Sequence, residues 1–244
     1  RFSPDGTWVT YWAGVLAGAS LSIRDSARVF VVAAAGGTPR PLAPDFVTAL
    51  WPIWSSDGSH VLFLGNRDGK SIEQSLDWWV APLEGGPAVK TGALDATRAD
   101  RLSGGLQVYG WALAPGAWEP DSQSVLFSAR AGDTTNLWRI GISSRTWTVA
   151  GRPERVTSGP ALEDSPSLAS GPGGTVRVAF ASMRQNLSIW SLPIDPNEGT
   201  VTGPVRRWTN QDADDFFPAL SSDGTRLVFV STRTGRQELW VRNL

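Results

Sequence analysis

The chain has 244 residues, with 22 basic and 23 acidic side chains and a net charge of −1, which is enough sequence for one large all-β domain or two small ones. The even charge balance does not favour a dedicated nucleic-acid binder, because such proteins gain affinity by neutralising phosphates. The absence of cysteine excludes disulfides and thiolate metal sites, and no apolar run reaches the roughly 18 residues of a transmembrane helix.

In chain order, the first recurring element is a tight turn followed by an apolar strand. Its five copies are FSPDGTWVTY at 2–11, WSSDGSHVLF at 54–63, WEPDSQSVLF at 118–127, GPGGTVRVAF at 171–180 and LSSDGTRLVF at 220–229. Asp-Gly predicts a tight hairpin, because glycine accepts the positive φ of such turns. Four copies carry an aspartate that we expect to cap its own turn: Asp5, Asp57, Asp121 and Asp223.

The second recurring element is an apolar segment with one large ring, expected to pack between neighbouring sheets. These rings belong to Phe30, Trp79, Trp138, Trp190 and Trp240, at intervals of 49, 59, 52 and 50 residues. A short element such as ERVTS (154–158) comes next, and a stretch such as LWPIW, SPSLA or FFPAL leads into the following turn. Each unit of about 50 residues therefore predicts four short strands, and no stretch shows a helical period with caps.

Such sheets cannot bury both faces alone, but radial stacking buries them and leaves only short edges. We therefore predict an all-β protein, a β-propeller of four-stranded antiparallel blades in a single domain over 1–244. Its partial end blades favour a fragment of a six- to eight-bladed ring over a closed ring of five blades. The five predicted blades are approximately 1–44 (partial), 45–94, 95–160, 161–210 and 211–244 (partial).

A series of arginines recurs just after the second strand of four repeats: Arg67, Arg130, Arg184 and Arg233. Acidic residues precede the first strand of the repeats, and they include Asp45, Asp100, Glu163, Asp164, Asp212, Asp214 and Asp215. In a four-stranded blade these two loops lie on one face. Two interpretations remain open, namely ion pairs between loops and a charged rim that contacts a partner or a small polar ligand. Exposed pairs add little stability, so the repetition favours geometry or recognition.

Few residues offer catalytic or metal-binding chemistry. The only histidine, His60, follows a turn and is expected at the surface, and no GxSxG motif marks a nucleophilic serine. The acidic segment 210–217 lacks the spacing of an EF-hand and is read as a solvated loop, with Ca²⁺ binding as the lesser alternative. We predict no other metal or cofactor and no enzymatic activity. Trp12, Trp111 and Trp147 break the repeat and are candidate surface anchors.

The order of motifs in the repeat resembles the TolB-type, WD-like propeller repeat. That order is Ser-Pro-Asp-Gly, a strand, an arginine, a glycine and Leu-Trp. The resemblance covers essentially the whole chain. It implies a partner-binding propeller like the periplasmic TolB, or the sensor-like end of a bacterial Ser/Thr kinase or winged-helix regulator. DWWVAPLEGGP and TNLWRI are most similar to the kinase- and regulator-linked type. Similar repeats also form the N-terminal propellers of prolyl-oligopeptidases and dipeptidyl-peptidases.

We therefore predict a non-catalytic binding, scaffold or sensor propeller that contacts a protein, a peptide or a small polar ligand through its channel face. The alternative is a propeller that limits substrate access in a serine hydrolase of the prolyl-oligopeptidase or dipeptidyl-peptidase type. The expected partner is a protein or peptide rather than nucleic acid or a membrane interior. The domain is expected to be monomeric within a larger chain. The compartment stays open, and the resemblance favours the periplasm.

Overall fold

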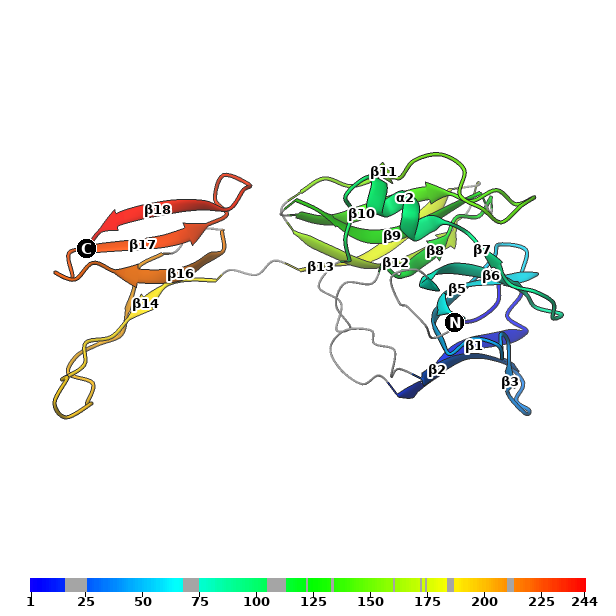
Figure 1. Ribbon diagram of the computed structural model, residues 1–244, viewed down its shortest axis with the longest axis horizontal. Coiled ribbons are helices and arrows are strands. Elements are labelled where there is room, and N and C mark those ends of the chain that lie inside the picture. Colours follow the sequence, from blue (N-terminus) through cyan, green and yellow to red (C-terminus); the bar gives the residue numbers. More distant parts are fainter. Residues whose placement is uncertain are drawn as a thin grey trace. The chain divides into compact units, whose positions relative to one another are not determined.

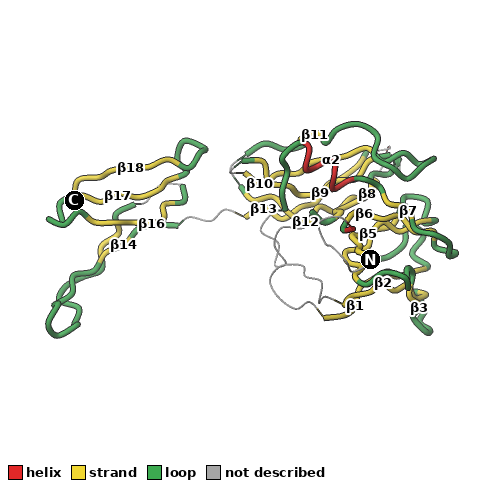
Figure 2. The backbone as a smooth tube through the Cα atoms, viewed as in Figure 1, coloured by secondary structure: helices red, strands yellow, loops and turns green. Residues whose placement is uncertain are grey.

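The computed structural model describes residues 1–15, 26–67, 75–104, 113–121, 123–132, 134–159, 161–171, 173, 175–183, 187–209 and 213–244. It consists mainly of short antiparallel strands, as Figures 1 and 2 show, so the all-β prediction is confirmed. The chain divides into two compact units, Arg1–Ser182 and Met183–Leu244. No helix in the described ranges is long and apolar enough to cross a membrane.

The first unit begins with two repeats whose strands run in chain order. The first repeat contains β1 (Trp8–Val15), β2 (Ser26–Ala33) and β3 (Arg40–Pro41). The second contains β4 (Thr48–Trp54), β5 (His60–Asn66), β6 (Asp77–Pro82) and β7 (Val89–Lys90). Within each repeat every strand pairs antiparallel with the next, and one parallel bridge, Ala27 to Thr48, joins the two repeats.

The third repeat is a separate four-stranded meander, and the first unit ends with two further paired strands. The meander contains β8 (Pro115–Trp118), β9 (Ser124–Ala131), β10 (Thr134–Gly141) and β11 (Glu154–Arg155). The next pair is β12 (Leu162–Ser170) and β13 (Val176–Met183).

The second unit holds two small antiparallel sheets. One pairs β14 (Trp190–Ser191) with β15 (Arg206–Arg207), and the other orders β16 (Asp215–Leu220), β17 (Arg226–Ser231) and β18 (Glu238–Asn243). The blade predicted over 161–210 thus spans the boundary between the two units. The assignment of residues 1–244 to a single domain stays a prediction.

The core of the first unit shows why its sheets stack face to face. Leu62 and Leu64 of β5 pack in a cluster with Phe127 of the third repeat. Val61 and Phe63, which alternate with them, pack in a second cluster with Val29 of the first repeat. Because successive side chains of a strand point to opposite faces, β5 is buried on both sides by its two neighbouring sheets. The first strands β4 and β8 also contact each other, as do β8 and β12. This is the arrangement of propeller blades.

In the first strand of three repeats the residue before a proline has a positive φ, and in two of them a β-bulge accompanies it. Trp51, Ser165 and Phe217 have φ values of 51°, 55° and 53°. The antiparallel register shifts across the bulge in β4 and again in β16. Proline cannot donate a ladder hydrogen bond, so the strand accommodates it by placing two residues opposite one. Positive φ at a non-glycine residue is uncommon and re-aims the residues that follow.

A short helix, α2 (Ala93–Ala99), interrupts the strands after β7, so the expectation that no stretch is helical is wrong here. Seven residues are too few to show a helical period in the sequence. The buried Asp77 organises this segment, because its carboxylate accepts backbone N–H bonds from Trp78 at 2.7 Å, Leu94 at 3.1 Å and Gly92 at 3.1 Å. Burial raises the pKa of Asp77, and these hydrogen bonds oppose that shift.

Candidate functional site

The turn aspartates make the same hydrogen bonds in three repeats. The Asp57 carboxylate accepts bonds from the Ser55 hydroxyl at 2.6 Å, the Ser59 hydroxyl at 2.7 Å and the Ser59 backbone N–H at 3.0 Å. Asp5 receives the corresponding bonds from Ser3 and Thr7. Asp223 receives them from Ser221 and Thr225. The carboxylates therefore bind their own turns, and the backbone N–H of Gln123 lies 2.9 Å from Asp121 in the third repeat.

These hydrogen bonds stabilise the ionised aspartates. Bonds from Ser3 and Thr7 lower the pKa of Asp5 to about 2, and bonds from Ser221 and Thr225 lower the pKa of Asp223 to about 2. Burial acts to raise the pKa of Asp57, but the bonds from Ser55 and Ser59 outweigh it and lower that pKa. A carboxylate that accepts several hydrogen bonds favours its charged form.

Arg67 lies at the other end of the second repeat, where β4 begins and β5 ends. Its guanidinium carbon is 4.9 Å from the centre of the Trp79 ring and 5.0 Å from that of Phe46. Its Nε is 2.9 Å from a carboxylate oxygen of Asp45. Two aromatic rings and one carboxylate thus fix the guanidinium, which favours such stacking because it is planar and weakly hydrated.

Arg233 has similar surroundings in the second unit. Its guanidinium carbon is 4.3 Å from the centre of the Trp240 ring and 5.2 Å from that of Phe229. It donates to the Asp215 carboxylate at 3.2 Å and to the Ser231 hydroxyl at 2.8 Å. The side chain of Asp215 is only 1% exposed. We call the contact of Arg67 with Trp79, and of Arg233 with Trp240, the arginine–tryptophan stack.

The remaining members of the predicted charged set have separate surroundings. Arg130 is exposed and donates to the Gly132 carbonyl at 2.9 Å, while Arg184 lies outside the described residues. The buried Glu163 accepts bonds from Asn136 and Thr157. Asp164 accepts the Ser165 backbone N–H at 2.7 Å, and Asp214 accepts that of Leu187 at 3.0 Å.

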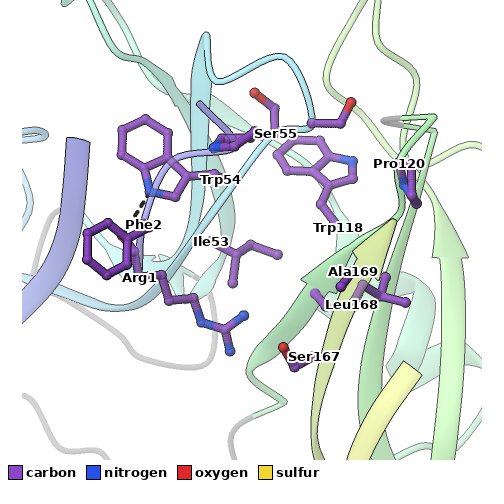
Figure 3. Close-up of a pocket in the computed structure, with 13 residues that line it drawn as sticks. Arg1, Phe2, Ile53, Trp54, Ser55, Trp118, Pro120, Ser167, Leu168 and Ala169 are labelled. Atoms are coloured by element: carbon purple, nitrogen blue, oxygen red, sulfur yellow. Dashed lines mark hydrogen bonds between the residues drawn. The ribbon is translucent and has the colours of Figure 1, made fainter. Parts of the chain in front are cut away.

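A cavity of about 640 Å³ opens at the turn ends of the first strands in the first unit (Figure 3). It lies beyond Ile53 and Trp54 of β4, whereas Asp45 and Arg67 lie at the opposite end of that strand. We call it the turn-end cavity, and we call the loops of the first unit that carry Asp45, Arg67 and Arg130 the charged-loop face. Four consecutive repeats line the cavity, with Arg1, Trp54, Trp118 and Leu168 as one residue from each.

The walls of the turn-end cavity are aromatic and apolar, with hydroxyls and one cation. The side chains of Trp54 and Trp118 are mostly buried, and the Trp54 indole N–H donates to the Arg1 carbonyl at 3.1 Å. Figure 3 draws the Arg1 guanidinium between Ile53 and Ser167. One guanidinium N–H donates to the Gly116 carbonyl at 2.6 Å, which connects the first repeat to the third.

Trp147 packs against Trp118 but is not among the residues that line the cavity. Its ring centre is 5.8 Å from that of Trp118 in an edge-to-face contact and 4.3 Å from that of His60. His60 is half-buried, its Nδ1 lies 2.7 Å from the Ser59 hydroxyl oxygen, and burial lowers its pKa while Asp57 opposes this. Trp12 packs against the core of the first two repeats, and Trp111 lies outside the described residues.

The cavity was not predicted from the sequence, although the prolines within the first strands could have indicated its position. Trp51-Pro52 and Ser165-Pro166 place a residue of positive φ and a proline directly before residues that line the cavity. Proline in a strand marks a bulge, and bulges are frequent beside binding sites.

The described residues contain no group of three side chains that could hold a metal ion. Residues 210–212 of the acidic loop lie outside the described ranges. Calcium binding at 210–217 stays a prediction.

Comparison with solved structures finds similar folds. A protein provisionally assigned as TolB from Agrobacterium tumefaciens is 17% identical, with a TM-score of 0.47, over 100% of this chain and 73% of that one. TolB from Acinetobacter baumannii is 14% identical, with a TM-score of 0.44, over 99% of this chain and 50% of that one. The β-propeller domain of the Trilobed protease from Pyrococcus furiosus is 11% identical, with a TM-score of 0.39, over 97% and 79%. At these identities the likeness concerns the fold alone. No family model and no curated protein matches the chain.

Proposed function

We propose that this chain is a binding or scaffold propeller that engages a protein or peptide through the turn-end cavity. The observation that carries the proposal is the convergence of four consecutive repeats on one aromatic-walled cavity. Ligand sites are concave and mostly apolar, with a few polar groups that fix orientation. The cavity is concave and its lining is polar and apolar in equal parts, with Trp54 and Trp118 among its walls and the Arg1 guanidinium beside them.

The capped turns support this role because they hold the cavity rim. Ser55 belongs to the capped turn of the second repeat and also lines the cavity. Pro4 lies within the corresponding turn of the first repeat. A rim held by hydrogen bonds loses little conformational entropy on binding, which is the benefit of preorganisation.

The charged-loop face is the second candidate surface. Its supporting observation is the exposed Arg130. Arg67 is less available, since two rings and Asp45 already surround it. In the second unit, replacement of Arg184 and Arg233 by alanine should weaken partner binding if the corresponding loops of that unit contact the partner. A loss of thermal stability without a loss of binding would assign these arginines a structural role.

Peptides selected from a displayed random library against the intact chain test which surface binds. Ala169 is an exposed residue that lines the cavity, so Ala169→Trp should fill it without disturbing the core. Arg130→Glu reverses a charge on the opposite face and is the matched control. We expect the selected peptides to lose at least tenfold in affinity, by fluorescence anisotropy, with Ala169→Trp only.

Loss of binding with Arg130→Glu alone would transfer the function to the charged-loop face. A library that yields no binder at either surface would contradict the proposal. The alternative role, a propeller that limits access to a serine hydrolase, is tested by reading the coding sequence on both sides of this segment. A hydrolase domain encoded after Leu244 would favour that role, in which case the cavity should be assayed for peptide entry.

A further inference from the structure

Arg1 is the one cation among the residues that line the turn-end cavity, and that lining includes no acidic residue. The structure gives Arg1 no carboxylate partner within the described residues, and only one of its five guanidinium N–H groups donates to the protein, at the Gly116 carbonyl. The cavity therefore presents an uncompensated positive charge whose remaining donors lie at its wall (Figure 3).

The rest of the lining is suited to a large apolar group. Trp54, Trp118, Ile53 and Leu168 provide flat or aliphatic walls, and Phe2, which is 68% exposed, lies at the edge. The volume of about 640 Å³ falls in the range of sites that enclose ligands larger than a single side chain. Aromatic rings gain both from buried area and from edge-to-face contact with indoles.

We propose that the turn-end cavity binds the free carboxyl terminus of a peptide whose last side chain is aromatic. The terminal carboxylate accepts hydrogen bonds from the Arg1 guanidinium, whose planar fork matches the two carboxylate oxygens. The final aromatic side chain packs between Trp54 and Trp118. This inference rests on the proposed function, because it names the partner chemistry of the same cavity.

The two parts of the site explain why the ligand needs both groups. A carboxylate without an apolar body would leave the indole walls hydrated, and an amidated peptide would leave the Arg1 charge uncompensated. Hydrogen bonds to charged groups are stronger than neutral ones, so removal of the carboxylate charge should weaken binding about tenfold or more. The Ser167 hydroxyl lies in the same lining and offers a further donor to the carboxylate.

The test uses the peptide acetyl-Gly-Gly-Phe with a free carboxyl terminus, the same peptide with an amidated terminus, and N-acetylphenylalanine. Binding to the intact chain is followed by the indole N–H resonances of Trp54 and Trp118 in two-dimensional NMR. We expect the free-acid peptide to shift these resonances, and the amide to bind about tenfold more weakly or less. Arg1→Gln should abolish the difference between the two peptides, and Arg1→Lys should restore part of it.

Arg28→Gln is the matched control. Arg28 is exposed, is not part of the cavity lining, and also donates one guanidinium bond to a backbone carbonyl, that of Pro44 at 3.1 Å. Its replacement should leave both affinities unchanged.

The outcomes separate this inference from the proposed function. Equal binding of acid and amide, lost in both cases with Ala169→Trp, would overturn the carboxylate assignment and leave the cavity as the binding site. N-acetylphenylalanine binding as tightly as the peptide would overturn the peptide assignment in favour of a small aromatic acid. Peptide binding that is insensitive to Ala169→Trp would overturn both. The absence of any response from the two indoles would overturn this inference alone, because the library-selected peptides test the proposed function separately.

Discussion

The second and the last repeat use nearly the same sequence to build the same local structure. LWPIWSSDGSHVLFL occupies 50–64 and FFPALSSDGTRLVFV occupies 216–230. Both segments contain the bulge before proline and the capped turn, and each of the two repeats also forms an arginine–tryptophan stack beyond its segment. Nearly identical sequence therefore reproduces the short-range geometry in these two repeats.

The two repeats differ in the carboxylate that pairs with the arginine. Asp45 comes from the loop before β4 and its side chain is 56% exposed, whereas Asp215 is the first residue of β16 and its side chain is 1% exposed. These two repeats thus share the contact of the arginine with its ring, while the neighbouring sequence decides where the counter-charge lies. Burial then decides how much the ion pair contributes to stability.

The largest expected effect is that of Arg233→Ala. It would leave the buried Asp215 carboxylate without its cation, and the Oδ2 of Asp215 has no other hydrogen-bond partner among the described residues. Breaking such a pair should lower the free energy of unfolding by about 3 kcal/mol. The free energy of unfolding is measured by urea denaturation of the original chain, of Arg233→Ala, and of the double variant Arg233→Ala/Asp215→Ala. The double variant should recover part of the loss, and equal stabilities of all three proteins would contradict the comparison.

Arg67→Ala should cost less, about 1 kcal/mol, because its ion pair is exposed and the stack on Trp79 and Phe46 supplies most of the effect. The same denaturation experiment gives the value. Asp45→Ala should then be almost neutral, in contrast to Asp215→Ala. A cost for Arg67→Ala as large as that for Arg233→Ala would show that burial of the counter-charge is not what separates the two repeats.

The capped turns predict an acid-dependent effect of intermediate size. The pKa of Asp223 falls from an unfolded value of about 3.9 to about 2 in the folded chain. A depressed folded pKa stabilises the fold above the unfolded pKa, and this stability is lost as the pH falls from about 4 to 2. Asp223→Ala should therefore destabilise the chain at pH 7 and flatten its acid profile, as measured by thermal unfolding. An NMR titration giving Asp223 an ordinary pKa would contradict this.

The smallest expected effect concerns the residue that follows the capped turn, which is His60 in the second repeat and Arg226 in the last. Burial lowers the pKa of His60, and Asp57 partly offsets this. The neutral ring is thus favoured in the fold, so stability is present above the unfolded value of about 6.5 and is lost as the pH falls below it. His60→Phe should keep the contact with Trp147 and remove this pH dependence. Arg226→Phe should leave the pH dependence of stability unchanged. Denaturation of both variants at pH 7 and pH 5.5 measures this difference.

The repeat made the strands and turns predictable because each depends on a few adjacent residues. Asp57 and Asp223 bond to residues within two positions, so their surroundings follow from the local phrase. The turn-end cavity depends instead on residues far apart in the chain, such as Arg1 and Gly116. The pairing of Arg233 with Asp215, rather than with another of the nearby acidic residues, likewise depends on which carboxylate the sheet buries.

The bulge before proline also has a consequence for self-association. β12 and β16 form an edge of their own sheets, and each contains such a proline, Pro166 or Pro218. An uninterrupted edge is a template onto which a strand from another molecule can add, and a proline removes one of the donors that such an addition would require. The proline next to the cavity-lining residues of β12 therefore also protects this edge against the addition of a strand from another molecule.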